Sequence, residues 1–299
     1  MNTFPLTRIN LIAMIAFLMM IFDNAIAATA TFDIPNSVVH TIDSKILNRS
    51  YDLYVKLPDG YMQPKNLSRA YPSIYLNDGP YTFQVASGVT HLPMGSGKFQ
   101  PSILIGISFA QGDNGMASRV RDLTPVKDKS WTKYTTGEAL DYLRFIETEV
   151  IPFIEKTYRT DPSSRTLSGQ SLGGSFGALA LLTKPTLFAN YILTSPSLWI
   201  HDEHIFKLEK HYAQSHQDLK AKVYFATGAL ETPDYNSLND MVALQQRFVA
   251  QLRSRQYPNL ILKDDIIEGS YHETTFPQGF TKGALWIYGN YDKSTEQPE

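Results

Sequence analysis

Apolar residues recur along the chain in short runs and alternating patterns that predict β-strands. Within residues 50–57, Tyr51, Leu53, Val55 and Leu57 alternate with more polar positions, which is typical of a half-buried strand. Continuous apolar runs bounded by turn residues favour fully buried strands. On these grounds the expected strands cover residues 37–43, 50–57, 72–76, 103–109, 165–168, 191–194, 222–227 and 260–267.

Helical spacing of apolar residues appears between several of these strands. It extends over residues 135–154, where Thr135 and Glu138 are spaced as in a capping box and Pro152 is placed to kink the helix. The polar stretch 110–133 is predicted to be a long loop. Further helices are expected at residues 172–182, 241–253 and 282–288.

The alternation of strands and helices predicts an α/β fold with a mostly parallel central sheet and helices on both faces. There is no internal repeat and no low-complexity linker, and 299 residues suit one large domain. In sheets of this kind, functional side chains gather at the carboxyl ends of the strands. The residues that follow the predicted strands are therefore the candidates for a site.

The first 27 residues have the pattern of a secretory signal peptide. Arg8 is followed by an apolar stretch at residues 9–22 and by the small-x-small sequence Ala-Ile-Ala, which ends at Ala27. Because a membrane span needs about 20 apolar residues, this stretch is short for one. We expect cleavage after Ala27, with residues 28–30 as a second candidate site and an uncleaved anchor as the alternative. The mature chain, residues 28–299, would be a single domain without stable membrane insertion, periplasmic or secreted.

Composition narrows the classes of partner and cofactor. The formal net charge is −2, so the chain lacks the basic footprint that nucleic-acid binding usually requires. It contains no cysteine, which removes disulfides, thiolate metal sites and cysteine nucleophiles. The segment His201-Asp202-Glu203-His204 shows no third ligand and is interpreted as polar surface. We therefore expect neither a metal nor a cofactor.

A candidate nucleophile lies between a predicted strand and a predicted helix. Residues 169–174 read Gly-Gln-Ser-Leu-Gly-Gly and fit the G-x-S-x-G pattern, in which a strained turn exposes the serine hydroxyl. Ser171 is the predicted nucleophile. The N–H of Leu172 would lie at a helix N-terminus and could donate to an oxyanion. The alternative is a glycine-rich turn that serves only tight packing.

A serine hydroxyl needs a base, and the base needs an acid that orients it. His272 follows the last predicted strand, where the histidine belongs in the chain order serine, acid, histidine, and we predict that it is the general base. The acid should follow the strand at residues 222–227. Glu231 is the first carboxylate there and is preferred; the other candidates are Asp234, Asp240 and, less suitably placed inside a strand, Asp264 and Asp265.

A second oxyanion donor is expected in the loop after the strand at residues 72–76. This loop reads Asn-Asp-Gly-Pro-Tyr at residues 77–81. Pro80 has no N–H, so Gly79 is the predicted donor and Tyr81 the reserve. The alternative is a plain turn, because Asn-Asp-Gly-Pro is a strong turn sequence in any context.

At this point the chain resembles a known family, the esterase branch of the α/β-hydrolases, which includes siderophore, feruloyl and acetyl esterases, S-formylglutathione hydrolase and mycolyltransferases. The resemblance covers nearly the whole mature chain. It implies the α/β-hydrolase fold, and the segments 119–125 and 195–199 look closest to enterobactin-type siderophore esterases. The matching segments are Tyr75-Leu76-Asn77-Asp78-Gly79, Arg119-Val120-Arg121-Asp122-Leu123-Thr124-Pro125, Phe153-Ile154-Glu155 with Tyr158, Gly169-Gln170-Ser171-Leu172-Gly173-Gly174, Ser195-Pro196-Ser197-Leu198-Trp199, residues 228–231 and His272.

The same resemblance implies two substrate contacts. Arg119 would be a candidate contact for an anionic ferric catecholate, and Trp199 would line the cleft. Two departures stand out: some siderophore esterases are described as serine–histidine dyads, whereas Glu231 fits a full triad, and the short 110–133 region leaves little room for a lid.

Three functions are compatible with these residues. The first is hydrolysis of a small-molecule carboxylic ester through an acyl-enzyme, with siderophore trilactones or acylated saccharides as substrates. The second is acyl transfer to an alcohol on the same residues, and the third is a non-catalytic binding module, which the retained triad disfavours. The pair Arg119 and Arg121 favours an anionic substrate, with a surface charge pair as the alternative. The sequence does not predict the oligomeric state.

Overall fold

The computed structural model describes residues 32–290, and its compact unit begins at Ile34. The predicted signal peptide and its cleavage site lie outside the described residues. Within residues 32–290, no helix combines the length and apolarity that crossing a bilayer requires.

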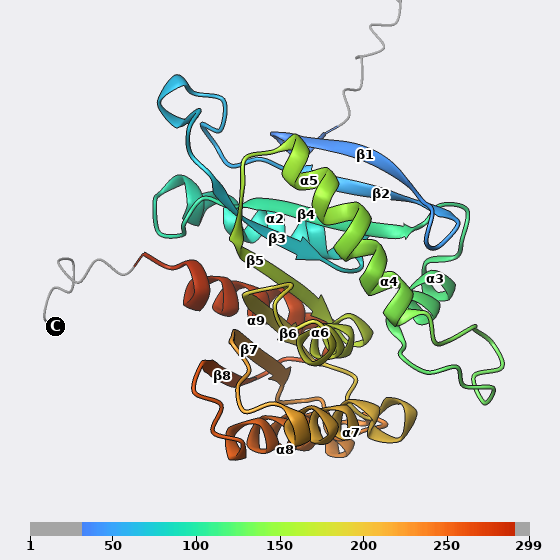
Figure 1. Cartoon of the computed structure of the whole chain (residues 1–299). Helices are drawn as coiled ribbons and strands as arrows, with labels where there is room; N and C mark the ends of the chain where they lie inside the picture. Colours follow the sequence, from blue (N-terminus) through green and yellow to red (C-terminus); the bar gives the residue numbers. More distant parts are fainter. Residues whose placement is uncertain (1–31, 291–299) are drawn as a thin grey trace, which may run out of the picture. The chain divides into compact units, whose positions relative to one another are not determined.

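An eight-stranded sheet forms the centre of the described chain, in the order β1-β2-β4-β3-β5-β6-β7-β8 (Figure 1). β2 pairs antiparallel with β1 and β4, and every later pair of neighbours is parallel. The predicted α/β-hydrolase fold with a mostly parallel sheet is therefore confirmed. The strands are β1 Ser37–Ser44, β2 Arg49–Lys56, β3 Tyr71–Leu76, β4 Ile103–Ala110, β5 Thr160–Gln170, β6 Asn190–Thr194, β7 Ala221–Gly228 and β8 Leu260–Ile267.

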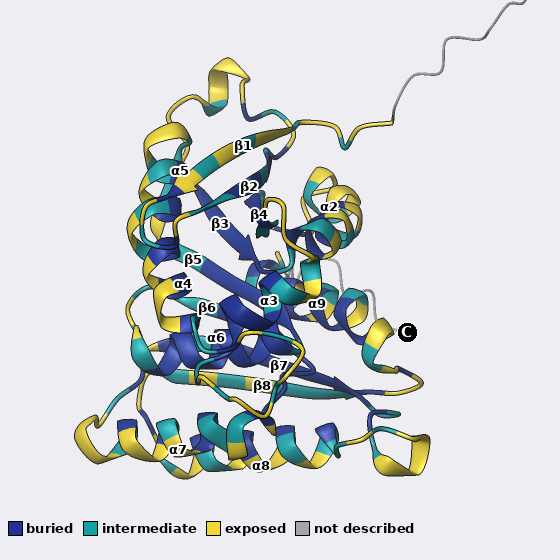
Figure 2. Cartoon of the chain, turned by 90° about the vertical axis from the view of Figure 1, so that its right-hand side faces the viewer, coloured by how far each residue is buried: buried dark blue, intermediate teal, exposed yellow. Residues whose placement is uncertain are grey.

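Helices cover both faces of this sheet (Figures 1 and 2). On one face, α2 and α9 bury Phe83 and Phe280 against Ile192. On the other face, α4 to α8 bury residues such as Phe176 and Phe248. The helices are α2 Gly79–Gly95, α3 Gly115–Leu123, α4 Ala139–Phe145, α5 Ile151–Thr157, α6 Leu172–Thr183, α7 Ile200–Ser215, α8 Met241–Ser254 and α9 His272–Tyr288.

All eight predicted strands are confirmed, with ends shifted by at most one residue except in β5, which is longer at both ends. The central strands are the reason for this agreement. Every residue of β3 is buried, and apart from Ser73 the strand appears in the sequence as an apolar run, as expected of a strand covered on both faces. The helices predicted at residues 172–182 and 241–253 are confirmed as α6 and α8.

The sequence Asn-Asp-Gly-Pro at residues 77–80 predicts a turn, but in the structure it starts α2, which was not expected. Asp78 is the N-cap residue and lies in the left-handed region, with φ of 56°. Pro80 is the second residue of the helix, where a missing N–H costs no intrahelical hydrogen bond. A helix start made of turn-forming residues is therefore indistinguishable from a turn by pattern alone.

The prediction of a loop throughout residues 110–133 is wrong, because α3 lies within it. The side chain of Asn114 caps this helix by accepting hydrogen bonds from the N–H groups of Met116 and Ala117. Arg121 and Asp122 of α3 are buried as ion-paired side chains. The inner face of α3 is therefore partly charged, and a search for apolar spacing misses it.

Two further helix predictions are corrected at their ends. The helix expected from residue 135 begins at Ala139 and is interrupted by a π-helical turn, Ile146–Val150, between α4 and α5. Glu138 makes no capping bond from its side chain; it binds Arg49 instead. The last helix begins at His272 rather than at residue 282. Pro277 lies inside α9, and because a proline usually kinks or ends a helix, the segment before residue 282 does not look helical in the sequence.

Candidate active site

Ser171 occupies the turn between the end of β5 and the start of α6. Its φ of 59° and ψ of −118° lie where residues other than glycine are strained. The turn is tight, because a Cβ atom at Gly169 would lie 2.4 Å from the carbonyl oxygen of Gly173. Glycine is therefore required at position 169, and the serine side chain projects from a sharp bend at the carboxyl edge of the sheet.

The residues after β6 contact this turn. The N–H of Ser171 donates to the carbonyl oxygen of Thr194 at 3.0 Å, and the N–H of Ser197 donates to the carbonyl oxygen of Ser171 at 3.0 Å. The two hydroxyl oxygens, Oγ of Ser171 and Oγ of Ser197, are 3.2 Å apart. The segment that follows β6 thus holds the backbone of Ser171 and also reaches its side chain.

The structure brings His272 and Glu231 together. Nδ1 of His272, the first residue of α9, lies 2.6 Å from Oε2 of Glu231, which follows β7. The imidazole is 39% exposed, whereas the carboxylate is 2% exposed. The amide of Gln170 donates a hydrogen bond to the carbonyl oxygen of His272, so the residue before Ser171 fixes the start of α9. A partly exposed imidazole therefore contacts a buried carboxylate, next to the turn that carries Ser171.

The other oxygen of Glu231 is fully occupied. Oε1 accepts hydrogen bonds from Oγ of Ser195 at 2.6 Å, from Oγ1 of Thr275 at 2.8 Å and from the N–H of Gly228 at 2.8 Å. Burial alone would raise the pKa of Glu231, but the hydrogen bonds from His272, Ser195 and Gly228 outweigh it and lower the pKa. The carboxylate is thereby kept ionised opposite the imidazole.

The alternative acids have other surroundings. Asp234 is exposed in a 3-10 turn, and Asp240 caps α8 by accepting from the N–H of Ala243 at 2.8 Å. Asp264 and Asp265 lie inside β8, where they bind Arg253 and the hydroxyl of Tyr224, respectively. Of the five candidates, Glu231 is the one that the structure places against His272.

Both predicted oxyanion donors are first residues of helices. Gly79 starts α2 and Leu172 starts α6, so their N–H groups have no partner within the helix. A Cβ atom at Gly173 would lie 3.4 Å from Oδ2 of Asp78, which shows that the two helix starts adjoin each other. The N–H of the reserve candidate, Tyr81, already donates to the carbonyl oxygen of Asp78 at 3.0 Å. Gly79 is therefore the better placed of the two.

Arg119 contacts Asp78 beside that donor. Its Nε lies 2.9 Å from Oδ1 of Asp78 and its Nη2 lies 3.0 Å from Oδ2, a bidentate pair between side chains that are 17% and 10% exposed. The structure thus places the predicted substrate contact against the residue that precedes Gly79. The positive charge of Arg119 is balanced by the carboxylate of Asp78.

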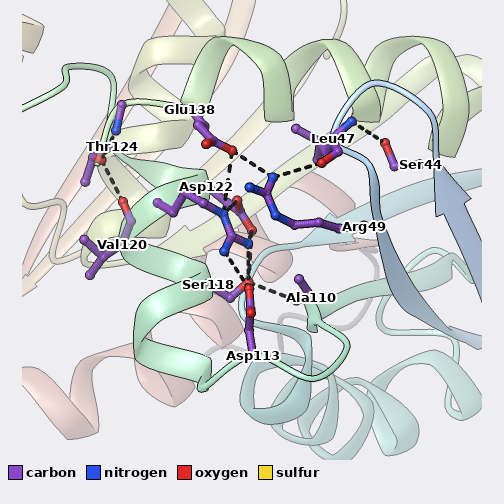
Figure 3. Close-up of polar contacts among 12 residues, drawn as sticks. Ser44, Leu47, Arg49, Ala110, Asp113, Ser118, Val120, Asp122, Thr124 and Glu138 are labelled. Carbon is purple, nitrogen blue, oxygen red and sulfur yellow. Dashed lines mark hydrogen bonds and ion pairs between the residues drawn. The ribbon is translucent and has the colours of Figure 1, made fainter. Parts of the chain in front are cut away.

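Arg121 lies in a separate, internal network of charged side chains. Figure 3 labels its partners Asp113, Asp122 and Glu138. Its Nε binds Asp122 at 2.8 Å, its Nη1 binds Asp113 at 2.5 Å, and Glu138 bridges it to Arg49. Burial raises the pKa of Asp122, and the hydrogen bond and charge of Arg121 only partly offset this rise. The expectation that Arg121 belongs to a pair of arginines facing an anionic substrate is therefore wrong, because its donors are used to anchor α3.

Trp199 stands at the start of α7 and is 36% exposed. Its ring stacks with that of Trp131, with centroids 6.4 Å apart and an angle of 17° between planes. Trp131 also packs on His201, whose side chain is only 3% exposed and whose Nδ1 lies 3.3 Å from Oδ2 of Asp128. The interpretation of residues 201–204 as polar surface is therefore wrong for His201. Within residues 32–290, no cluster of three or more His, Asp or Glu side chains could hold a metal ion.

Sequence reasoning missed four polar residues that contact the candidate triad. They carry ordinary hydroxyl or amide side chains, and only spatial proximity distinguishes them from others of their kind. For three of them a signal was present, since Gln170, Ser195 and Ser197 lie in segments that support the family resemblance. The four are Gln170, Ser195, Ser197 and Thr275.

Comparison with known proteins gives a consistent result. A family model described as "Putative esterase" matches residues 44–286. Ferri-bacillibactin esterase BesA of Bacillus subtilis is 29% identical over 225 residues, which are 70% of this chain and 75% of that protein. A siderophore enterobactin esterase of Emericella nidulans is 33% identical over 150 residues, which are 44% of this chain and 48% of that protein.

Solved structures agree in fold. The crystal structure of the BES protein from Bacillus cereus superposes with a TM-score of 0.76 at 26% identity, covering 89% of this chain and 99% of that one. The siderophore hydrolase EstB from Aspergillus nidulans superposes with a TM-score of 0.74 at 21% identity, covering 91% of this chain and 100% of that one. At the lower identity the likeness shows the fold alone.

Proposed function

Because the chain belongs to the esterase family and is an ester hydrolase, we propose that it acts through an acyl-enzyme on Ser171. In this mechanism, Oγ of Ser171 attacks the ester carbonyl carbon while His272 takes its proton. The same proton then passes to the leaving alcohol as the ester bond breaks. In the second half, His272 takes a proton from water, the hydroxide attacks the acyl carbon, and the proton returns to Ser171.

The observation that carries this proposal is the 2.6 Å contact between Nδ1 of His272 and the buried, ionised Glu231, beside a serine on a strained turn. Glu231 orients the imidazole and stabilises its charged form. The N–H groups of Gly79 and Leu172 are assigned to the developing oxyanion, since each lies at a helix N-terminus with positive partial charge.

We further propose a siderophore as the substrate. Two relatives are named ferri-bacillibactin esterase and siderophore enterobactin esterase. In addition, the edge of the sheet that bears Ser171 carries several exposed apolar side chains. These side chains follow the carboxyl ends of five parallel strands, at the same edge of the sheet as the proposed triad, which supports a bulky, aromatic ester as the substrate. They are Tyr81, Met116, Trp199, Tyr235, Leu238 and Tyr271.

Arg119 and Trp199 are assigned to the substrate side of the site. Trp199 offers an exposed aromatic face, already stacked on Trp131, to an aryl group. Arg119 adds a cation whose position is fixed by Asp78. An exported enzyme would meet such a substrate outside the cytoplasm, and we propose that residues 1–27 direct this export.

The first experiment compares the mature wild type with Ser171→Ala on p-nitrophenyl acetate and butyrate. We expect turnover by the wild type and a loss of several orders of magnitude in the variant. The matched control is Ser168→Ala, which removes a buried hydroxyl with no hydrogen-bond partner among the described residues and should leave activity unchanged. Equal activity in wild type and Ser171→Ala would exclude Ser171 as the nucleophile.

Substrate class is tested next with the same three proteins. Ferric and iron-free catecholate trilactones should be hydrolysed faster than acetylated or feruloylated saccharides. Product analysis with an added acceptor alcohol separates hydrolysis from acyl transfer, since only transfer gives a new ester. Activity confined to saccharide esters would overturn the siderophore assignment and leave the serine mechanism standing.

A further inference from the structure

The turn Ser195-Pro196-Ser197, directly after β6, contacts both ends of the proposed triad. Ser195 is fully buried and donates from Oγ to Oε1 of Glu231 at 2.6 Å. Two residues later, Ser197 donates from its N–H to the carbonyl oxygen of Ser171, and its Oγ lies 3.2 Å from Oγ of Ser171. One short segment therefore touches the acid through one serine and the nucleophile through the other.

We propose that this turn is a positioning element of the active site, in which the hydroxyl of Ser195 holds the Glu231 carboxylate and the hydroxyl of Ser197 holds that of Ser171. The inference rests on the proposed catalytic roles of Ser171, His272 and Glu231. Under it, the spacing between acid and nucleophile is set by the length of a single turn.

The two oxygens of the Glu231 carboxylate have different partners, which supports this role for Ser195. His272 contacts Oε2, whereas Ser195 contacts Oε1, so the carboxylate cannot rotate without losing one of the two. The other donors to Oε1 are Gly228, three residues before Glu231, and Thr275, three residues after His272. They move with the acid or the base. Ser195 follows β6, the strand next to the one that carries the nucleophile, so it connects two otherwise separate parts of the site.

The backbone of the turn is strained and tightly enclosed. Ser195 has φ of 42°, in the region that glycine adopts at lower cost, and its N–H donates to the carbonyl oxygen of Ala226 at 2.6 Å. A Cβ atom at Gly174 of α6 would lie 3.0 Å from Cα of Pro196, so the turn is wedged against the helix that starts after the nucleophile. A serine at a position that favours glycine implies that its hydroxyl contributes something that glycine cannot.

The closing experiment separates the hydroxyl of Ser195 from its backbone. Ser195→Gly keeps the left-handed turn and removes the donor, whereas Ser195→Ala removes the donor and keeps the strain. We expect both to lower kcat/KM for p-nitrophenyl butyrate by about tenfold to a hundredfold, through kcat rather than KM. The acid limb of the pH dependence should also move to higher pH, because the carboxylate loses a donor and its charge then favours the imidazolium more strongly.

The outcomes distinguish this inference from the proposed function. Wild-type kcat and an unmoved pH profile in Ser195→Gly would overturn the role of the hydroxyl. For Ser197→Ala we expect kcat to fall about tenfold, with a slower reaction of Ser171 with a fluorophosphonate; unchanged rates would overturn its role. Ser171→Ala is measured alongside. If that variant stays active, the serine mechanism itself fails, whereas an inactive Ser171→Ala with an unimpaired Ser195→Gly refutes the positioning role alone.

Discussion

Glu231 keeps its charge in the interior because hydrogen-bond donors surround both of its oxygens. A buried carboxylate without partners would bind a proton and lose its ability to stabilise an imidazolium. Here three donors occupy Oε1 and the imidazole of His272 occupies Oε2. Nearly all of the hydrogen-bonding capacity of the carboxylate is therefore used to fix its orientation and to keep it charged. The role proposed for Glu231 depends on that charge.

Glu231→Gln tests that dependence. The substitution keeps the size of the side chain but removes its charge and the acceptor that fixes the tautomer of His272, so kcat should fall by about a thousandfold to ten-thousandfold. The measurement is the steady-state rate with p-nitrophenyl butyrate. Asp234→Asn is the control, because Asp234 is an exposed acid of the same loop and should be dispensable. A loss of less than tenfold would indicate a serine–histidine dyad.

Arg119 holds the corner that carries the proposed oxyanion donor Gly79. Lysine retains the charge but cannot form the bidentate pair with Asp78. For Arg119→Lys we expect kcat with a neutral ester to fall about tenfold with little change in KM, because the loop loses its orientation. Parallel assays with a neutral and an anionic ester decide the role. A rise in KM confined to the anionic ester would show, in addition, the substrate contact proposed for Arg119, whereas an unchanged kcat with the neutral ester would contradict the positioning role.

At the scale of elements, the strands and the order of the catalytic candidates were predictable and several helix starts were not. Fully buried strands appear as apolar runs, and chain order restricts the acid and the base to the ends of particular strands. The start of α2 is built from turn-forming residues around Asp78, and α3 buries Arg121 in ion pairs. Both features hide a helix from a search for apolar periodicity. The contacts of Ser195 and Thr275 with Glu231 join segments that are far apart in the sequence and are brought together by the sheet, so the local sequence pattern does not predict them.

The junction of β5 and α6 stores strain that a mutation can release. Ser171 has φ of 59°, which costs a side-chain-bearing residue about 1–3 kcal/mol. Ser171→Gly should therefore be more stable than Ser171→Ala by about 1 kcal/mol, after the larger entropy of glycine in the unfolded chain is subtracted. Urea unfolding of the two inactive variants measures this difference directly. Equal midpoints would mean that the turn relaxes when the hydroxyl is removed.

At the scale of the whole molecule, the parallel sheet gathers residues from distant parts of the sequence at one edge. Ser171, Glu231 and His272 follow β5, β7 and β8, and the proposed donor Gly79 follows β3. None of these elements lies before Ile34, where the compact unit begins. The proposed catalytic residues therefore all belong to that unit.

Export is the purpose that the amino-terminal pattern predicts. When the full chain is expressed in a Gram-negative host, the recovered protein should begin at Ala28 and appear in the osmotic-shock fraction. Ala27→Leu places a large residue where a small one is required and should leave the leader attached. Because the compact unit begins at Ile34, a chain that starts at residue 28 should match the processed protein in urea midpoint and esterase activity. Amino-terminal sequencing and fractionation provide the readout. An intact leader on wild-type protein in the membrane fraction would identify residues 9–22 as an uncleaved anchor and place the same active site at a membrane surface.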